Sequence, residues 1–213
     1  MYNSPHMVIT YLGGGFIKIT SGETTLAVNP ISKDSSLKQS RFKADVVLVS
    51  MNHPDFNGIE NVTHGEPGPF VIDGPGEYEV RKMIIRGLQS ETNYDKNYHI
   101  HTLFIVTIEN SKLCFLGAHS NPKLSPNLTE ALDGVDILFM PIGGNGTLNA
   151  TEAHNLGVDI GPHIYIPTFF DDASLKTFLK EEGGKEVTPI EKFTFKKKDL
   201  EGREGDIIVL GKK

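Results

Sequence analysis

The arrangement of apolar segments changes midway along the chain, and this change constrains the fold more than any other feature of the sequence. In the first half, short β-rich runs alternate with clusters of Gly, Pro, Asn and Asp, which is typical of strands joined by turns. In the second half, strand-like runs alternate with helix-like segments. This order predicts two β-sheets with helices packed outside them. In the first half we expect strands at residues 7–11, 16–20, 24–28, 45–50, 70–72 and 83–86.

The second half begins with a predicted β-hairpin, in which residues 103–108 and 113–116 flank a tight turn. Its cysteine, Cys114, lies in the middle of a strand, where we expect a buried packing role. Asn149 and Glu152 form a capping-box pattern that predicts a helix to about residue 158. We expect a second helix over residues 172–182 and strands at residues 137–140, 163–167, 193–195 and 207–210.

Length and charge limit the classes of protein to consider. A chain of 213 residues can form one substantial core, so we expect a single domain over residues 1–213. The formal net charge of -6 argues against binding to nucleic acid, which requires clustered Lys and Arg. No apolar stretch approaches the ~20 residues of a membrane helix, and no signal peptide is recognisable at the N-terminus. One cysteine excludes an internal disulfide, so a cytoplasmic protein is expected.

Residues 50–56 form a chemically distinctive segment directly after the apolar run at residues 46–49. They read Ser-Met-Asn-His-Pro-Asp-Phe, so two metal-binding side chains, His53 and Asp55, alternate with two that are poor ligands. The thioether of Met51 is poorly matched to Zn²⁺, Mn²⁺ or Fe²⁺ in a His/Asp site. The phenyl ring of Phe56 donates no lone pair.

This segment resembles T-H-x-H-x-D-H, the strand-ending signature of the metallo-β-lactamase superfamily. In that signature two histidines bind one metal ion, and the aspartate and the last histidine bind a second. The resemblance implies that His53 and Asp55 stand at ligand positions. It also implies that Met51 and Phe56 replace two of the histidines.

Three further segments are similar to the small single-domain branch of that superfamily, the Zn-dependent hydrolases related to ascorbate-phosphate lactonases. They are residues 9–16, 26–30 and 70–79. Gly14 stands where the branch usually has histidine, and Asn29 replaces an aspartate. The resemblance implies an αββα four-layer sandwich of two mixed β-sheets flanked by helices.

Two later ligand positions also depart from the family pattern. Family members bridge their two metals with an aspartate in a segment like F-L-G-D, where this chain has Ala118. Their final histidine follows I-P-x, where this chain has Phe169. Without the bridging carboxylate, the repulsion between two divalent cations is uncompensated, so no tightly bound dinuclear centre and no cofactor are expected. We expect apolar side chains to refill the site, because an empty cavity is costly.

Three functional hypotheses follow. The first is a metallo-β-lactamase-fold homologue that has lost most metal ligands and acts as a non-catalytic binding or assembly protein. The second is a metal-dependent hydrolase of phosphoesters or lactones, in which His53, Asp55 and His119 hold one weakly bound Zn, Mn or Fe ion and Asp55 is catalytic. The third is a scaffold or homo-oligomer subunit whose old pocket is filled core. The expected partner is an unidentified small molecule or protein.

Several other polar residues are candidates for the pocket. Glu77 and Glu79 share one strand face, where paired carboxylates serve acid–base chemistry or only flank a turn. The loop Gly143, Gly144 and Asn145 precedes a helix and could hold an anion on its backbone N–H groups, although it lacks the Lys-Ser/Thr of a P-loop. We place Glu77 and this loop at the pocket rim. His99 and His101 alternate along a strand and could form a two-histidine clamp.

Overall fold

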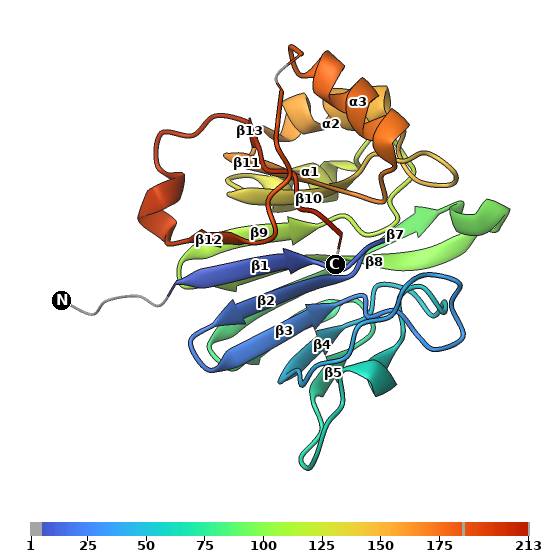
Figure 1. The fold of residues 1–213 in the computed structure, drawn as a ribbon, viewed down its shortest axis with the longest axis vertical. Helices are drawn as coiled ribbons and strands as arrows, with labels where there is room; N and C mark the ends of the chain where they lie inside the picture. Colours follow the sequence, from blue (N-terminus) through green and yellow to red (C-terminus); the bar gives the residue numbers. More distant parts are fainter. Residues whose placement is uncertain (1–5, 185, 213) are drawn as a thin grey trace.

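Two β-sheets lie face to face in the computed structural model, which describes residues 6–184 and 186–212 (Figure 1). The first sheet has six strands in the order β12-β1-β2-β3-β4-β5. Strands β1, β2 and β3 pair antiparallel, and β3, β4 and β5 pair parallel, so the sheet is mixed. The strands are β1 (Met7–Tyr11), β2 (Ile17–Ser21), β3 (Thr24–Val28), β4 (Val46–Leu48), β5 (Phe70–Ile72) and β12 (Phe193–Phe195).

The second sheet has seven strands in the order β13-β11-β10-β9-β8-β7-β6. Strands β6 to β9 pair antiparallel, and β9, β10, β11 and β13 pair parallel. The prediction of two mixed sheets is therefore confirmed. The strands are β6 (Gly76–Val80), β7 (Met83–Thr92), β8 (His99–Ile108), β9 (Ser111–Phe115), β10 (Ile137–Pro141), β11 (Ile164–Thr168) and β13 (Asp206–Ile207).

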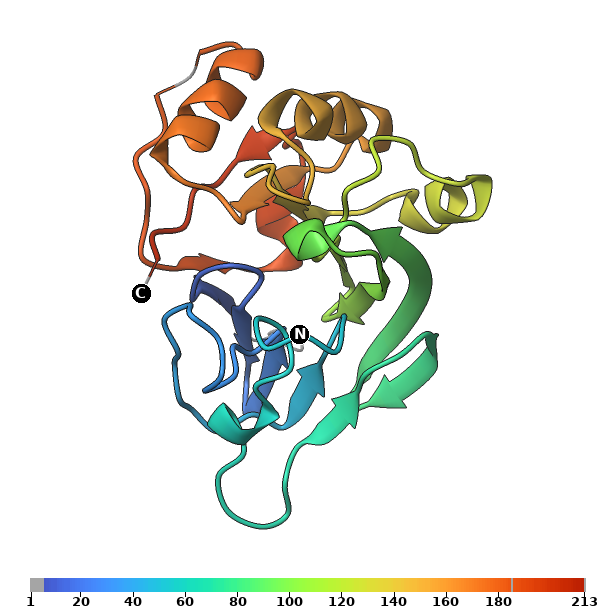
Figure 2. The same ribbon diagram turned by 90° about the vertical axis from the view of Figure 1, so that its right-hand side faces the viewer.

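Three helices pack on the seven-stranded sheet, on the side that faces away from the other sheet (Figures 1 and 2). They are α1 (Pro126–Leu132), α2 (Ala150–Ile160) and α3 (Asp172–Glu181). Helix α2 begins with the predicted capping box, in which Asn149 and Glu152 each accept a hydrogen bond from the backbone N–H of the other. Strands β10 and β11 are buried along their whole length, because the core covers one face and the helices cover the other.

The outer face of the six-stranded sheet is covered differently. Among the described residues, no α-helix lies there. Apolar side chains of β3, β4 and the loop after β1 instead pack against a long loop, residues 31–44, and against the short 3-10 helix η1 (Ile59–Asn61). This fourth layer of the sandwich is therefore mainly loop. Residues 32–41 are mostly polar, so apolar side chains do not recur there at the spacing of a helix.

Several elements differ from the sequence-based expectation. Helix α1 was not predicted, β6 was expected only as a strand face shared by Glu77 and Glu79 with no bounds, and β7 and β8 extend well beyond the expected runs. Both α1 and β6 carry a weak apolar pattern: β6 is an edge strand bearing two exposed glutamates, and α1 has seven residues. Cys114 is buried, as expected. Within residues 6–184 and 186–212, no helix combines the length and the apolar character required to cross a bilayer.

Candidate functional site

The four positions at which the resemblance places lost ligands come together in the structure. Met51, Phe56 and Ala118 form a separate buried cluster, each at most 4% exposed, and Phe169 packs against it. Tyr94 is the fifth member of this group. The group is called the plug below. Its members come from the loop after β4, the segment between β7 and β8, and the ends of β9 and β11.

The three aromatic rings of the plug, those of Phe56, Tyr94 and Phe169, pack on one another. Phe56 lies edge-to-face with Tyr94, with ring centroids 5.1 Å apart, and stacks on Phe169 at 5.8 Å. Tyr94 and Phe169 are 6.0 Å apart at a steep angle. These separations are those of favourable aromatic pairs. The positions of the plug are therefore occupied by packed side chains.

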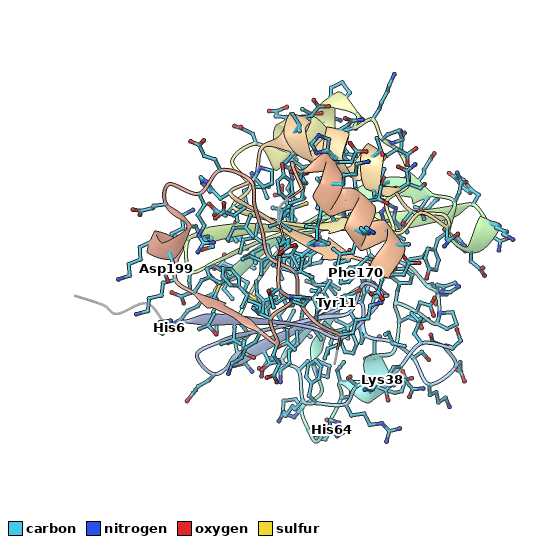
Figure 3. All side chains as sticks on the ribbon, turned by 45° about the horizontal axis from the view of Figure 1, so that its top comes forward. His6, Tyr11, Lys38, His64, Phe170 and Asp199 are labelled. Carbon is cyan, nitrogen blue, oxygen red and sulfur yellow. The ribbon has the colours of Figure 1, made fainter. Side chains whose placement is uncertain are left out.

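The position of Phe169 depends on glycines from two other segments. Phe169 has a left-handed backbone with φ 54°, and its N–H lies within hydrogen-bonding distance of the Gly14 carbonyl and the Tyr11 hydroxyl. A Cβ on Gly15 would lie 2.8 Å from the Phe169 ring, and one on Gly143 would lie 1.8 Å from the Phe169 carbonyl oxygen. Tyr11 in turn stacks on Phe170, the next residue (Figure 3). Only glycine allows this approach at both places.

Asp55 retains a ligand-type side chain, but its oxygens already accept hydrogen bonds. Ser35 Oγ donates to Oδ1, and the Tyr94 hydroxyl donates to Oδ2 at 2.7 Å. Burial, with the hydrogen bond to Asp55, raises the pKa of Tyr94 well above its ordinary value, so Tyr94 keeps its proton and remains a donor. The Asp55 carboxylate is therefore anchored to the plug.

His53 lies beside the plug with its Nδ1 3.7 Å from Asp55 Oδ2. The same nitrogen accepts a hydrogen bond from the Asp55 N–H at 3.2 Å. The His53 ring makes edge contacts with Tyr94 at 5.3 Å and with His99 at 6.0 Å. His53 thus belongs to an aromatic environment, in which one of its two nitrogens is already engaged.

His119 lies in a different environment from His53 and Asp55. Its Nδ1 is 3.3 Å from Ser90 Oγ, and its ring is 5.9 Å from that of His101. Both rings are buried, and burial lowers the pKa of each to about 4, so both are neutral near pH 7. His101 Nε2 is 3.2 Å from the Leu116 carbonyl, which can only accept, so this nitrogen carries the proton.

The grouping proposed for one metal ion, His53, Asp55 and His119, is not formed. Across residues 6–184 and 186–212, no three or more His, Cys, Asp or Glu side chains are grouped so that they could hold a metal ion. The physical reason is local: Ala118 lies in a tight turn after β9, closed by the hydrogen bond from the His119 N–H to the Leu116 carbonyl at 3.2 Å, and it faces the plug while His119 contacts Ser90 and His101. His99 and His101 are likewise divided, since one contacts His53 and the other His119.

Asn29, which stands where the family has an aspartate, is buried and neutral. Its side-chain oxygen accepts a hydrogen bond from the Ser50 N–H at 2.9 Å. A buried charge without a partner is costly, whereas an amide in this position is satisfied by one backbone donor. The substitution therefore suits a site without metal charge.

A pocket of about 480 Å³ lies over the plug. It is called the pocket below. His53, Tyr94 and Phe169 line it together with Asp55, and the predicted loop Gly143, Gly144 and Asn145 lies on its border. Glu77 does not: the expectation that it lies at the rim is wrong. It lies on the edge strand β6, exposed to solvent, with its carboxylate 3.5 Å from Arg86.

Sequence reasoning missed several residues that line the pocket, of which Tyr94 and Ser35 also hydrogen-bond to Asp55. Tyr94 belongs to a short 3-10 helix, η2 (Tyr94–Lys96), between two long strands, and no motif marks it. Ser35 lies in the loop that replaces the fourth helical layer. The polar run Asp34, Ser35 and Ser36 was the only signal, and it is also common in loops.

Comparisons with known proteins agree with this geometry. Residues 8–169 match the family model of the β-lactamase superfamily domain. The structure is similar to a Thermotoga maritima protein assigned to the Zn-dependent hydrolases of the metallo-β-lactamase superfamily, with TM-score 0.73, 22% identity, and coverage of 96% of this chain and 100% of that one. No curated protein matches the chain.

Two further solved structures are similar. One is Igni18, a metallo hydrolase from Ignicoccus hospitalis, with TM-score 0.62, 18% identity, and coverage of 90% of this chain and 99% of that one. The other is CmlA, a diiron β-hydroxylase from Streptomyces venezuelae, with TM-score 0.63, 12% identity, and coverage of 91% and 55%. At these identities the likeness shows the fold alone, and that fold is the metallo-β-lactamase fold.

Proposed function

The chain belongs to the β-lactamase superfamily, and we propose that it is a non-catalytic member whose former metal pocket binds a ligand without hydrolysing it. The observation that carries the proposal is the plug. Met51, Phe56, Ala118 and Phe169 occupy positions where the resemblance places metal ligands, and they pack together as one apolar group.

The side chains at the site do not fit a dinuclear metal centre. A catalytic zinc uses about three protein ligands and one open position, and a bridged pair uses more. Methyl and phenyl groups at Ala118, Phe56 and Phe169 offer no lone pair. Asp55 remains, but Ser35 and Tyr94 already donate to its two oxygens. We derive no metal-dependent step for this chain.

The apolar side chains of the plug also stabilise the folded protein by their packing. Burying a Phe or Met side chain contributes roughly 1.5–3 kcal/mol each to stability, and Met51 and Phe56 are both buried. Two metal ions with their water ligands would have to displace these side chains. Binding would therefore have to offset lost packing in addition to the repulsion between the ions.

Metal content is the first test. The protein is purified without chelators, and Zn, Mn and Fe are measured per chain. We expect amounts far below one equivalent. One or two equivalents held through dialysis would refute the loss of the metal centre and would favour the hydrolase hypothesis.

A matched variant tests whether the plug occupies the metal positions. Met51→His, Phe56→His, Ala118→Asp and Phe169→His are combined in one chain, which returns the family's ligand types. We expect this variant to gain Zn²⁺ binding relative to the original chain. Circular dichroism establishes that the variant is folded. A folded variant that binds no more Zn²⁺ than the original chain would mean that these four positions do not correspond to metal ligands.

Hydrolysis is the second test. Purified protein with added Zn²⁺, Mn²⁺ or Fe²⁺ is assayed on phosphodiester and lactone substrates, beside His53→Ala and Asp55→Ala. We expect no turnover above the level of the two variants. Turnover that depends on both residues would establish the single-metal hydrolase instead.

A further inference from the structure

We infer that the pocket over the plug takes a small organic cation, such as an alkylammonium group, rather than the anionic substrate of a metal-dependent phosphoesterase. The inference rests on the proposed function and names the ligand class of that same site. It is carried by two independent features of the pocket: the sign of its charge and the aromatic rings that line it.

The charge of the pocket is negative. Asp34, Asp55 and Asp95 all line it, and none of the described lining residues is Lys or Arg. In a metal-loaded relative, divalent cations would reverse the sign of this field. Without them the carboxylates repel an anion and attract a cation, and a pocket with low-dielectric walls strengthens both effects.

Asp55 is the carboxylate best placed to contact such a ligand. Its side chain is 15% exposed, so its charge is largely removed from water. Its two hydroxyl donors, Ser35 and Tyr94, are neutral and use one lone pair on each oxygen. A carboxylate has about four acceptor positions. The remaining positions can accept N–H donors of an ammonium group entering from the pocket.

Aromatic side chains line the same pocket. Tyr94, Phe169 and His53 line the pocket together with Asp55. A cation within about 6 Å of an aromatic ring face is attracted by the ring quadrupole, and quaternary ammonium groups are bound this way between several rings. A carboxylate and several aromatic rings in one pocket together favour a cation that also carries apolar surface.

The loop expected to hold an anion, Gly143 to Asn145, uses one of its three N–H groups, that of Gly144, internally. The Gly144 N–H donates to the Leu148 carbonyl at 2.9 Å, and the Thr147 N–H donates to the Gly144 carbonyl at 3.0 Å. These donors are therefore used within the loop. A phosphate placed beside Gly143 and Asn145 would also share the pocket with the three carboxylates.

The test compares ligands of matched shape. Choline and n-butylammonium are titrated into ¹⁵N-labelled full-length protein at low salt. The neutral isostere of choline, 3,3-dimethylbutan-1-ol, and methyl phosphate are titrated in parallel. We expect saturable shifts of the Tyr94, Gly144 and Phe169 amides with both cations. We expect the neutral isostere to bind on the order of tenfold more weakly, which is about 1.4 kcal/mol, and methyl phosphate to give no saturable shift.

Two variants locate the charge. Asp55→Asn keeps the size of the side chain and should weaken cation binding at least as much as the neutral isostere does. Glu77→Gln removes the same charge far from the pocket, on the exposed edge strand β6, and should leave binding unchanged.

The inference is overturned if neither cation gives saturable shifts, if methyl phosphate binds as well as choline, or if Asp55→Asn and Glu77→Gln have equal effects. These outcomes differ from failure of the proposed function, which is decided by metal content. A metal-free protein that binds methyl phosphate would retain the proposed function and lose only the ligand class.

Discussion

The buried pair His101 and His119 predicts that the protein loses stability between pH 6.5 and pH 4. The pKa of both imidazoles is lowered to about 4, by burial in each case and, for His101, also by the nearby His119. An unfolded chain exposes these groups at a pKa of about 6.5. Between the two values the unfolded state binds more protons, so unfolding becomes easier as pH falls.

The magnitude follows from the size of the pKa difference. Each pKa unit corresponds to about 1.36 kcal/mol, so the complete effect approaches roughly 3 kcal/mol for each imidazole below pH 4. At pH 5 about 2 kcal/mol of that is lost per imidazole, and almost none is lost at pH 7.5. The stability that comes from keeping the two imidazoles neutral is thus complete above pH 6.5. It is lost progressively as the pH falls from 6.5 to 4.

The assay is urea unfolding at pH 7.5 and pH 5.0 for the original chain and two variants. His101→Gln keeps an N–H near the position that faces the Leu116 carbonyl, and His119→Asn keeps a polar atom near Ser90. Each variant should lose about 2 kcal/mol less than the original chain between the two pH values. His64→Gln, at an exposed position, is the matched control and should leave the pH dependence unchanged.

The reasoning is refuted if the original chain is equally stable at both pH values. It is also refuted if the His101→Gln and His119→Asn chains lose as much stability as the control. Either result would mean that the two imidazoles become protonated in the folded state without penalty.

Three further predictions concern the plug, a glycine that supports it, and a separate buried carboxylate, Asp136. Phe56→Ala should destabilise the protein by about 3–5 kcal/mol, because a fully buried ring leaves a cavity; thermal melting measures the loss, and a variant as stable as the original would mean that the plug is not packed core. Gly15→Ala should cost about 1–3 kcal/mol, because its methyl group would lie 2.8 Å from the Phe169 ring, while Gly74→Ala, with open space around it, should cost little. Asp136→Asn should cost about 1–3 kcal/mol, because the buried carboxylate accepts from Lys197 Nζ at 2.6 Å and from the Lys112 N–H; equal urea midpoints for this variant and the original chain would contradict that role.

The sequence predicted the fold well where one physical signal dominated. Apolar runs between turn residues placed most strands, and the Asn149 and Glu152 pattern placed α2. The bounds of β6 were missed, although Glu77 and Glu79 were expected on one strand face, because an edge strand tolerates exposed charge and shows little apolar pattern. Helix α1 was missed although Ser125 caps it, because seven residues are too few for a periodic pattern.

The site was predictable only in part, because the order of residues in a motif does not determine the direction in which each side chain points. His119 was expected near His53 since it follows Ala118, but a tight turn at Gly117 and Ala118 directs Ala118 to the plug and His119 to Ser90 and His101. Tyr94 could not be found, because its place in the plug follows from how two long strands reverse direction. The grouping of Met51, Phe56 and Phe169 could be predicted, because the resemblance aligns each of them with a metal ligand of the family.

The plug draws its members from segments that are distant in the chain, so the proposed absence of a metal site would be difficult to reverse by single substitutions. A single reversion such as Phe56→His would place one imidazole among aromatic rings with no metal to bind and would cost core packing at once. Each separate step back is therefore unfavourable, although the four together restore a ligand set. Variants with one, two or three of the four substitutions would be less stable than the original chain and would still lack the full ligand set. A mutant library meant to recover an enzyme from this chain must vary the four positions simultaneously.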